Sequence, residues 1–180
     1  MKILKAIIIL TLSLSVCSCK KLFNCEDQEL TIKQTYYSGN ELRTDGYYLN
    51  NDSTSDIFEI LILFKNGIIV KNAYGDGFSI EIIESNIKNG SFFSSQKTIK
   101  RHWGLYKITN ENFRMESWKA SPCSMPINEI QGEILNDTTL KFTKTTFTNT
   151  TKYNEEFKTI NEVYHFKKFA KPDSSVTFFN

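Results

Sequence analysis

The run Ile57-Phe58-Glu59-Ile60-Leu61-Ile62-Leu63-Phe64 is followed by Lys65-Asn66-Gly67 and then by Ile68-Ile69-Val70-Lys71-Asn72-Ala73-Tyr74. The first run is apolar at nearly every position, which predicts a strand that is covered on both faces. An Asn-Gly pair between two apolar runs is a strong hairpin signal, because both residue types accept a positive φ. The stretch 57–74 therefore predicts an antiparallel hairpin in the middle of a sheet.

Strand patterns continue on both sides of this hairpin. Thr, Ile, Phe and Tyr are abundant after the first 30 residues, Pro is scarce and turn signals recur. Further strands are predicted over 30–37, 42–49, 103–108, 113–118, 129–135, 139–147 and 157–169. The predicted turns are at 109–112 and 136–137, and the polar segments 50–55 and 148–155 are predicted loops.

Residues 78–88 have a different pattern. The residues at helical spacing are Ile80, Ile83, Glu84 and Ile87. Asn89-Gly90 follows them as a helix C-terminal cap would. We expect one short amphipathic helix that turns Phe78, Ile82 and Ile83 toward the sheet, with a further strand as the alternative.

About eight antiparallel strands joined by short turns need their edges closed, and a barrel closes them. The predicted fold class is therefore all-β: an antiparallel β-barrel or half-barrel with one short helix. We expect a single barrel domain over residues 30–171 and a loose C-terminal tail over 172–180.

The beginning of the chain has the pattern of a secretory signal. Lys2 and Lys5 give a positive start, and an apolar run over 6–16 follows. The run is shorter than the ~20 residues that a membrane-spanning helix needs. It ends in Val16-Cys17-Ser18-Cys19, a box with a small residue before a cysteine, as in bacterial lipoprotein signals.

We therefore expect a lipoprotein signal peptide over 1–18 and a lipidated tether over 19–29. Cys19 is the predicted lipid attachment site and Cys17 the alternative, while an ordinary cleaved signal is the competing interpretation. Acyl chains on Cys19 would hold the protein at a membrane. The expected location is the cell envelope, at the outer membrane, with the leaflet left open.

The two remaining cysteines are Cys25 and Cys123. In an oxidising compartment such a pair predicts a disulfide, here one that joins the tether to the domain. Two free thiols are the alternative.

Charge and motifs narrow the classes of function. The formal net charge of the whole chain is +2, and the loss of Lys2 and Lys5 leaves the mature chain near neutral, so nucleic acid is not an expected partner. His102 and His165 lie far apart, without metal-ligand spacing. No Gly-rich phosphate loop and no Gly-x-Ser-x-Gly motif is present. We expect no cofactor, no metal and no enzyme activity.

Several short stretches follow one another in an informative order: Leu42–Tyr48, Leu63–Ile69, Trp103–Ile108, Gly132–Thr138, Tyr164–Phe166 and Lys171–Ser174. In this order they resemble small lipocalin-like lipoproteins of Bacteroidetes. The resemblance covers most of the chain after the tether, and it implies a barrel fold and an envelope location. Asp52-Ser53-Thr54 and Asp137-Thr138-Thr139 also resemble the O-glycosylation acceptor pattern of Bacteroidetes.

Aromatic residues are numerous for one small domain. The candidates for a ligand-binding wall are Tyr48, Tyr74, Trp103, Tyr106 and Trp118. A barrel of about eight strands can hold one small ligand, although the same rings could simply fill the interior. The sequence predicts a membrane-anchored, non-catalytic protein that binds a small apolar ligand or an envelope protein. A structural lipoprotein with a filled barrel is the alternative, and an envelope hydrolase is less favoured.

Overall fold

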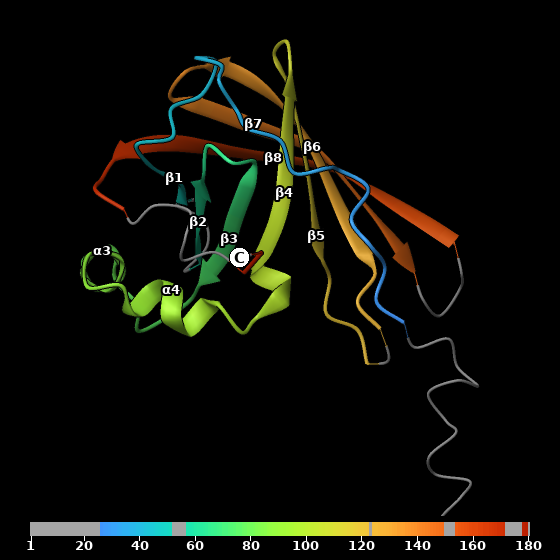
Figure 1. The fold of residues 1–180 in the computed structure, drawn as a ribbon, viewed down its shortest axis with the longest axis horizontal. Helices are drawn as coiled ribbons and strands as arrows, with labels where there is room; N and C mark the ends of the chain where they lie inside the picture. Colours follow the sequence, from blue (N-terminus) through green and yellow to red (C-terminus); the bar gives the residue numbers. More distant parts are fainter. Residues whose placement is uncertain (1–25, 52–56, 123, 150–153, 172–177, 180) are drawn as a thin grey trace, which may run out of the picture.

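The computed structural model describes residues 26–51, 57–122, 124–149, 154–171 and 178–179. Eight antiparallel strands form a closed barrel, in which each strand pairs with its neighbours in the sequence and β1 pairs with β8 (Figure 1). The strands are β1 (Gly46–Asn51), β2 (Phe58–Leu63), β3 (Ile68–Tyr74), β4 (Trp103–Thr109), β5 (Asn112–Trp118), β6 (Ile127–Asn136), β7 (Thr139–Asn149) and β8 (Asn154–Lys168). The predicted antiparallel β-barrel is confirmed.

The β2–β3 hairpin has a three-residue loop. The backbone N–H of Phe64 donates to the carbonyl of Ile68 at 2.8 Å, and that of Gly67 donates to the carbonyl of Phe64 at 3.0 Å. In this loop Gly67 takes a positive φ, of 83°, and Asn66 does not. The loop is a turn closed by a left-handed glycine, which matches the twist of the strands. A Cβ on Gly67 would also meet the carbonyl of Thr35 at 2.5 Å.

Strand β2 is covered on both faces, as predicted. Leu61 and Leu63 point into the barrel, whereas Ile60 and Ile62 point outward to a layer of helices. The inner core takes side chains from all eight strands: Tyr48, Leu61, Leu63, Ile69, Tyr106, Phe113, Met115, Ile130, Ile134, Leu140, Phe142 and Tyr164, together with Leu42 from the N-terminal segment. Over this length the barrel is filled with protein side chains.

The outer layer consists of α3 (Ile80–Lys88), α4 (Ser91–Gln96) and the short 3₁₀ helix η1 (Lys100–His102), which connect β3 to β4 (Figure 1). The predicted helix is therefore confirmed as α3. Ser79 caps its beginning, and Gly90, with a φ of 77°, follows its end. Ile83 and Ile87 are buried against the barrel.

Two of the three residues expected to face the sheet do not. Phe78 is 54% exposed and Ile82 is 48% exposed. Ile83 and Ile87, one helical turn apart, form the buried stripe, and Ile82 lies ~100° around the helix from Ile83. Helix α4 was not predicted; its six residues are too few for a helical period, but they bury Phe92 and Phe93.

The N-terminal segment 26–45 crosses the outside of the barrel. The strand predicted over 30–37 is absent, because Thr31 and Ile32 donate their N–H groups to the Glu116 carboxylate on β5 and not to a neighbouring strand. The segment passes the β2–β3 turn, where the N–H of Tyr37 donates to the carbonyl of Lys65, and then the β6–β7 turn, where the N–H of Arg43 donates to the carbonyl of Asp137. Strand β1 begins at Gly46 and not at Leu42.

The remaining strands follow the prediction with longer bounds. The β4–β5 turn is at Asn110-Glu111, where Asn110 has a φ of 56°. The loop expected over 148–155 is shorter, because β7 runs to Asn149 and β8 begins at Asn154. Within the described part of the chain, none of the helices is long and apolar enough to cross a membrane.

The tail expected to be loose is partly packed. The rings of Phe178 and Phe179 lie 6.0 and 5.9 Å from that of Trp118. Burial of apolar rings on the outer layer holds these two residues against the barrel.

Candidate functional site

The two ends of the barrel differ. The end where β2 begins and β3 ends, which also carries the helices and the β5–β6 loop, is called the mouth here (Figure 1). At the opposite end, Leu42 is buried in the inner core and Tyr37 packs beside it. The hydroxyl of Tyr48 donates a hydrogen bond there, with the carbonyls of Arg43 and Asp137 each 3.0 Å away. That end is closed by the protein's own chain.

A cavity of about 550 Å³ lies at the mouth. It is lined by Glu59, Lys71, Asn72, Ala73, Arg101, His102, Ser117, Trp118, Lys119, Ala120 and Asn128. Its size is within the usual range of small-molecule sites, and eight of its eleven lining residues carry polar or charged side chains.

Glu59 and Lys71 line the bottom of the cavity. Together with their partners Glu162 and Tyr164 they form a charged group on the inner face of the barrel, called the floor below. Lys71 Nζ lies 2.8 Å from Glu59 Oε2 and 3.8 Å from Glu162 Oε2. The Tyr164 hydroxyl hydrogen-bonds to the carboxylate of Glu59 and lies 3.1 Å from Glu162 Oε2. One ammonium faces two carboxylates, so with all three groups ionised the floor has a net charge of −1.

The alternation of each strand places these residues. Glu59 precedes Leu61 by two positions on β2, and Lys71 is paired with Leu61 across the β2–β3 ladder. Residues two apart share a face, so Glu59 and Lys71 point inward, as Leu61 does. Charges at the edge of an apolar core require partners, because an unpaired ion loses its hydration without compensation. The inner face therefore changes from apolar to charged at the mouth.

Tyr164 connects the floor to the apolar interior. Its ring is buried, 4.8 Å from that of Phe142. Burial, and then the carboxylates of Glu59 and Glu162, hold the pKa of Tyr164 well above its ordinary value. The hydroxyl thus keeps its proton at physiological pH, and it can donate that proton to one carboxylate at a time. The other carboxylate keeps acceptor capacity for a ligand.

The rim of the cavity is cationic. Arg101 and Lys119 are exposed, and η1 places His102 beside the ends of β3 and β5. His102 Nδ1 is in hydrogen-bond contact with the amide oxygen of Gln96, which requires Nδ1 to carry a proton. Burial, and then the charge of Arg101, lower the pKa of His102. At neutral pH the rim therefore owes its charge to Arg101 and Lys119.

The five predicted aromatic residues do not form one wall. Tyr48 and Tyr106 are in the filled inner core, whereas Tyr74 and Trp103 are in the outer core between the barrel and the helices. Trp103 Nε1 donates to the carbonyl of Gln96, and the Tyr106 hydroxyl donates to that of Phe64. Trp118 alone of the five lines the mouth cavity.

Sequence reasoning missed the floor. It named none of Glu59, Lys71, Glu162 and Tyr164 as a site residue. The available signal was a charged residue at an inward-facing position of an otherwise apolar strand.

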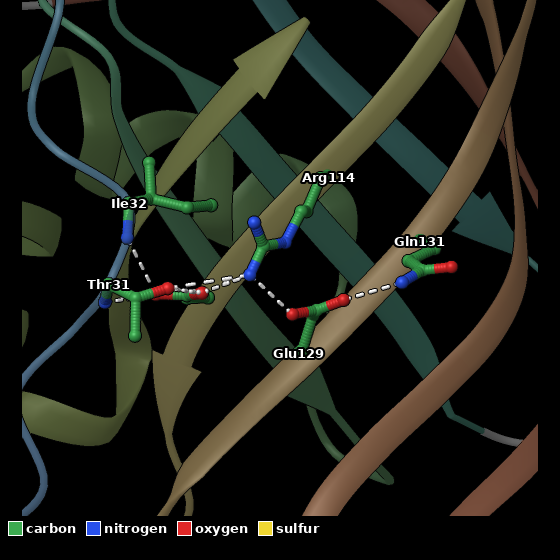
Figure 2. A network of polar contacts seen from close by, with 6 residues as sticks. Thr31, Ile32, Arg114, Glu129 and Gln131 are labelled. Carbon is green, nitrogen blue, oxygen red and sulfur yellow. Dashed lines mark hydrogen bonds and ion pairs between the residues drawn. The ribbon is translucent and has the colours of Figure 1, made fainter.

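A second cavity, of about 510 Å³, lies on the outside of the barrel under the N-terminal segment. Figure 2 shows its polar network, in which Arg114 lies 2.7 Å from Glu116 Oε1 and 2.6 Å from Glu129 Oε2. Gln131 donates to the other oxygen of Glu129 at 2.5 Å. The charged groups pair with one another, and Glu116 also accepts the backbone N–H of Thr31. We therefore assign this network a structural role: it holds the N-terminal segment 26–45 against the barrel.

Some predicted sites lie outside the described residues: Cys17, Cys19, Cys25, Cys123 and the triplet Asp52-Ser53-Thr54. In the second triplet, Asp137 and Thr138 form the β6–β7 turn. Within the described ranges there is no group of three or more His, Cys, Asp or Glu side chains placed to hold a metal ion.

Comparisons of the chain with protein-family models, with curated proteins and with solved structures find no match.

Proposed function

We propose that this chain is a lipid-anchored, non-catalytic protein of the cell envelope whose barrel binds one small polar ligand at its mouth. The observation that carries the proposal is the charged floor of the mouth cavity. Glu59, Lys71 and Glu162 point into a barrel that is otherwise filled with apolar side chains. Inward-facing charges beside a cavity of ligand size are suited to polar recognition.

The charges favour one class of ligand. A net negative floor attracts an ammonium group or hydroxyl donors, and Arg101 and Lys119 on the rim attract an anionic or carbonyl group. The filled interior leaves no apolar chamber below the floor. The cavity therefore favours a small zwitterion or amino sugar over the apolar ligand expected from the aromatic composition.

The proposed lipid attachment site is Cys19, with Cys17 as the alternative, and the acyl chains would hold the protein at the outer membrane. Two acyl chains attached to the cysteine give stable anchoring. The proposal predicts that metabolic labelling with an alkynyl fatty acid marks the wild-type chain and the Cys17→Ala variant. It predicts that Cys19→Ala abolishes labelling, and labelling of Cys19→Ala with none of Cys17→Ala would move the site to Cys17.

Ligand binding is tested by thermal unfolding with putrescine, glucosamine, β-alanine and palmitate as probes. We expect one of the three amine-bearing probes to raise the melting temperature by about 5 °C at a concentration near 100 times its Kd. Palmitate should have no effect on the delipidated chain. Stabilisation by palmitate alone would contradict a polar site.

The matched variants are Glu162→Gln and Glu133→Gln. Glu162→Gln neutralises the floor and keeps the 2.8 Å pair of Lys71 with Glu59. Loss of a charge-assisted hydrogen bond should weaken binding about tenfold. Glu133 is exposed, and it lies near the end of β6 away from the mouth, so Glu133→Gln should bind as the wild type does.

A structural lipoprotein is the second candidate, and the filled inner core favours it. In that case the barrel is a rigid support, and the outer face makes protein contacts. This candidate predicts that none of the four probes changes the melting temperature.

A further inference from the structure

Three large apolar side chains are exposed at one corner of the mouth. Ile57 and Phe78 are each 54% exposed, and Ile82 is 48% exposed. The Phe78 ring lies 5.5 Å from that of Tyr74, which stacks at 5.4 Å on Phe58. The rings of Phe58, Tyr74 and Phe78 form a row. These three residues, with the exposed Ile57 and Ile82, are called the mouth corner below.

The contacts that attach α3 to the barrel do not involve these exposed side chains. Ile83 and Ile87 attach the helix to the barrel, and Tyr47 and Lys167 hold it through Glu84, each at 2.8 Å. Phe78, which precedes the cap residue Ser79, and Ile82, in the first turn of the helix, are exposed and take no part in that contact. Isolated exposed apolar residues are common, whereas a contiguous group beside an opening marks a contact surface.

Basic side chains lie at the same end of the barrel. They are Lys97, Lys100, Arg101 and Lys119. The acidic groups there are Asp27, which pairs with Lys100 at 2.6 Å, and the exposed Glu26, Glu29, Asp76 and Glu81. Arg101 and Lys119 are the exposed basic residues that line the mouth cavity. Apolar side chains beside basic ones are typical of surfaces that dock on anionic membranes.

The tether also arrives at this end. The N–H of Gln28 donates to the carbonyl of Met125 in the β5–β6 loop at 3.1 Å, and Asp27 accepts from the N–H of Met125 at 2.8 Å. In Figure 1 the described chain begins at the lower end of the barrel, where α3, α4 and the β5–β6 loop also lie. Cys19 precedes Asp27 by eight residues, which span at most about 28 Å. Acyl chains on Cys19 would therefore enter the bilayer near the mouth.

We propose that the mouth corner docks on the bilayer that holds the lipid anchor, so that the mouth opens toward the membrane surface. Phe78 and Ile82 enter the headgroup layer, and the basic side chains contact anionic headgroups. The orientation rests on the lipid anchor of the proposed function. It implies that the mouth receives its ligand at the membrane surface.

The test uses the lipidated chain in vesicles of phosphatidylethanolamine and phosphatidylglycerol with brominated acyl chains, which quench tryptophan in the bilayer. Phe78→Trp places a probe in the mouth corner. Leu135→Trp is the matched control, because Leu135 is 53% exposed near the opposite end of the barrel. We expect the added fluorescence of Phe78→Trp to fall by about half, and that of Leu135→Trp to be unchanged. Equal quenching of both, quenching of Leu135→Trp alone, or quenching of neither would overturn the proposal.

A second measurement separates docking from anchoring. The unlipidated Cys19→Ala chain should sediment with the same vesicles in low salt, and Ile82→Glu should release it, whereas Leu135→Glu should not. Absence of sedimentation overturns docking even if Cys19 is lipidated, and sedimentation supports docking even if it is not. Dimers in sedimentation velocity that Ile82→Glu abolishes, without vesicle binding, would assign the corner to a second copy and overturn the proposal. Probe binding at the mouth is measured in solution and is independent of these results.

Discussion

The side chain of Glu116 holds the backbone of Thr31, 85 positions away in the sequence: its Oε2 accepts the Thr31 N–H at 2.6 Å. The same carboxylate accepts the Thr31 hydroxyl at 2.6 Å and the N–H of Ile32 at 2.9 Å (Figure 2). Glu116 is 1% exposed and pairs with Arg114 at 2.7 Å. One carboxylate on β5 thus fastens the segment that leads from the tether to the barrel.

Replacement of Glu116 should loosen this segment. In Glu116→Ala, two backbone N–H groups lose their acceptor, and Arg114 loses one of its two ion pairs. We expect the free energy of unfolding to fall by about 3 kcal/mol, as for other broken buried pairs. Urea unfolding measures the loss, and hydrogen exchange should show faster exchange at Thr31 and Ile32.

Glu133→Ala is the control, because Glu133 is exposed on the outer face of the barrel. Its effect should stay within about 0.5 kcal/mol. If Glu116→Ala and Glu133→Ala are equally stable, Glu116 does not fasten the segment.

The disulfide between Cys25 and Cys123 stays a prediction, because both cysteines lie outside the described residues. Asp27 and Met125 are hydrogen-bonded, and each follows one of the two cysteines by two residues. Peptide mapping without reduction should recover a linked peptide, and reduction should cost about 2–4 kcal/mol of stability. Alkylation of both thiols without prior reduction would exclude the bridge.

His102 should make stability depend on pH. Its pKa is lowered below 6.5 in the folded state, by burial and then by Arg101. The unfolded chain therefore takes up this proton first, and stability should fall as pH decreases from about 6.5. Carboxylates with lowered pKa values, such as Glu84 and Glu129, lose their contribution only below about 4.5.

Urea unfolding at pH 7.5 and 5.5 isolates the histidine. The wild type should lose more stability between the two values than His102→Gln. Identical losses in the two proteins would show that His102 does not contribute in this window.

The filled interior predicts the effect of a core substitution. Phe142 is fully buried between Phe113, 5.7 Å away, and Tyr164, 4.8 Å away. Phe142→Ala should lower the free energy of unfolding by about 3–5 kcal/mol and create an apolar cavity. A hydrophobic dye should bind the variant more strongly than the wild type. Strong dye binding by the wild type would show an open interior instead.

The fold could be predicted where local signals agreed with tertiary structure. The β2–β3 hairpin was predictable because an apolar run, a turn glycine and a second apolar run follow directly. The strand predicted over 30–37 failed, because Leu30 and Ile32 have strand-like spacing but their segment pairs with a side chain. Local pattern does not distinguish these two partners.

The site was less predictable, because it depends on closure of the barrel. Glu59 and Lys71 come together through the register of one hairpin. Glu162 and Tyr164 come from β8. They lie beside Glu59 and Lys71 because β8 pairs with β1 and so closes the barrel. Phe78 and Ile82 were wrongly expected to face the barrel. A helical period gives the spacing of the buried residues, but it does not say which residue the buried face includes.

Native mass spectrometry of the protein purified from its own cells tests the central claim most directly. The comparison is with Ala73→Trp, which fills the cavity from an inward-facing position and leaves the ion pairs of the floor intact. We predict that the wild type and Leu135→Trp retain a small polar molecule that Ala73→Trp lacks. No added mass on any of the three proteins, or an apolar molecule retained equally by all three, would contradict a ligand site at the mouth.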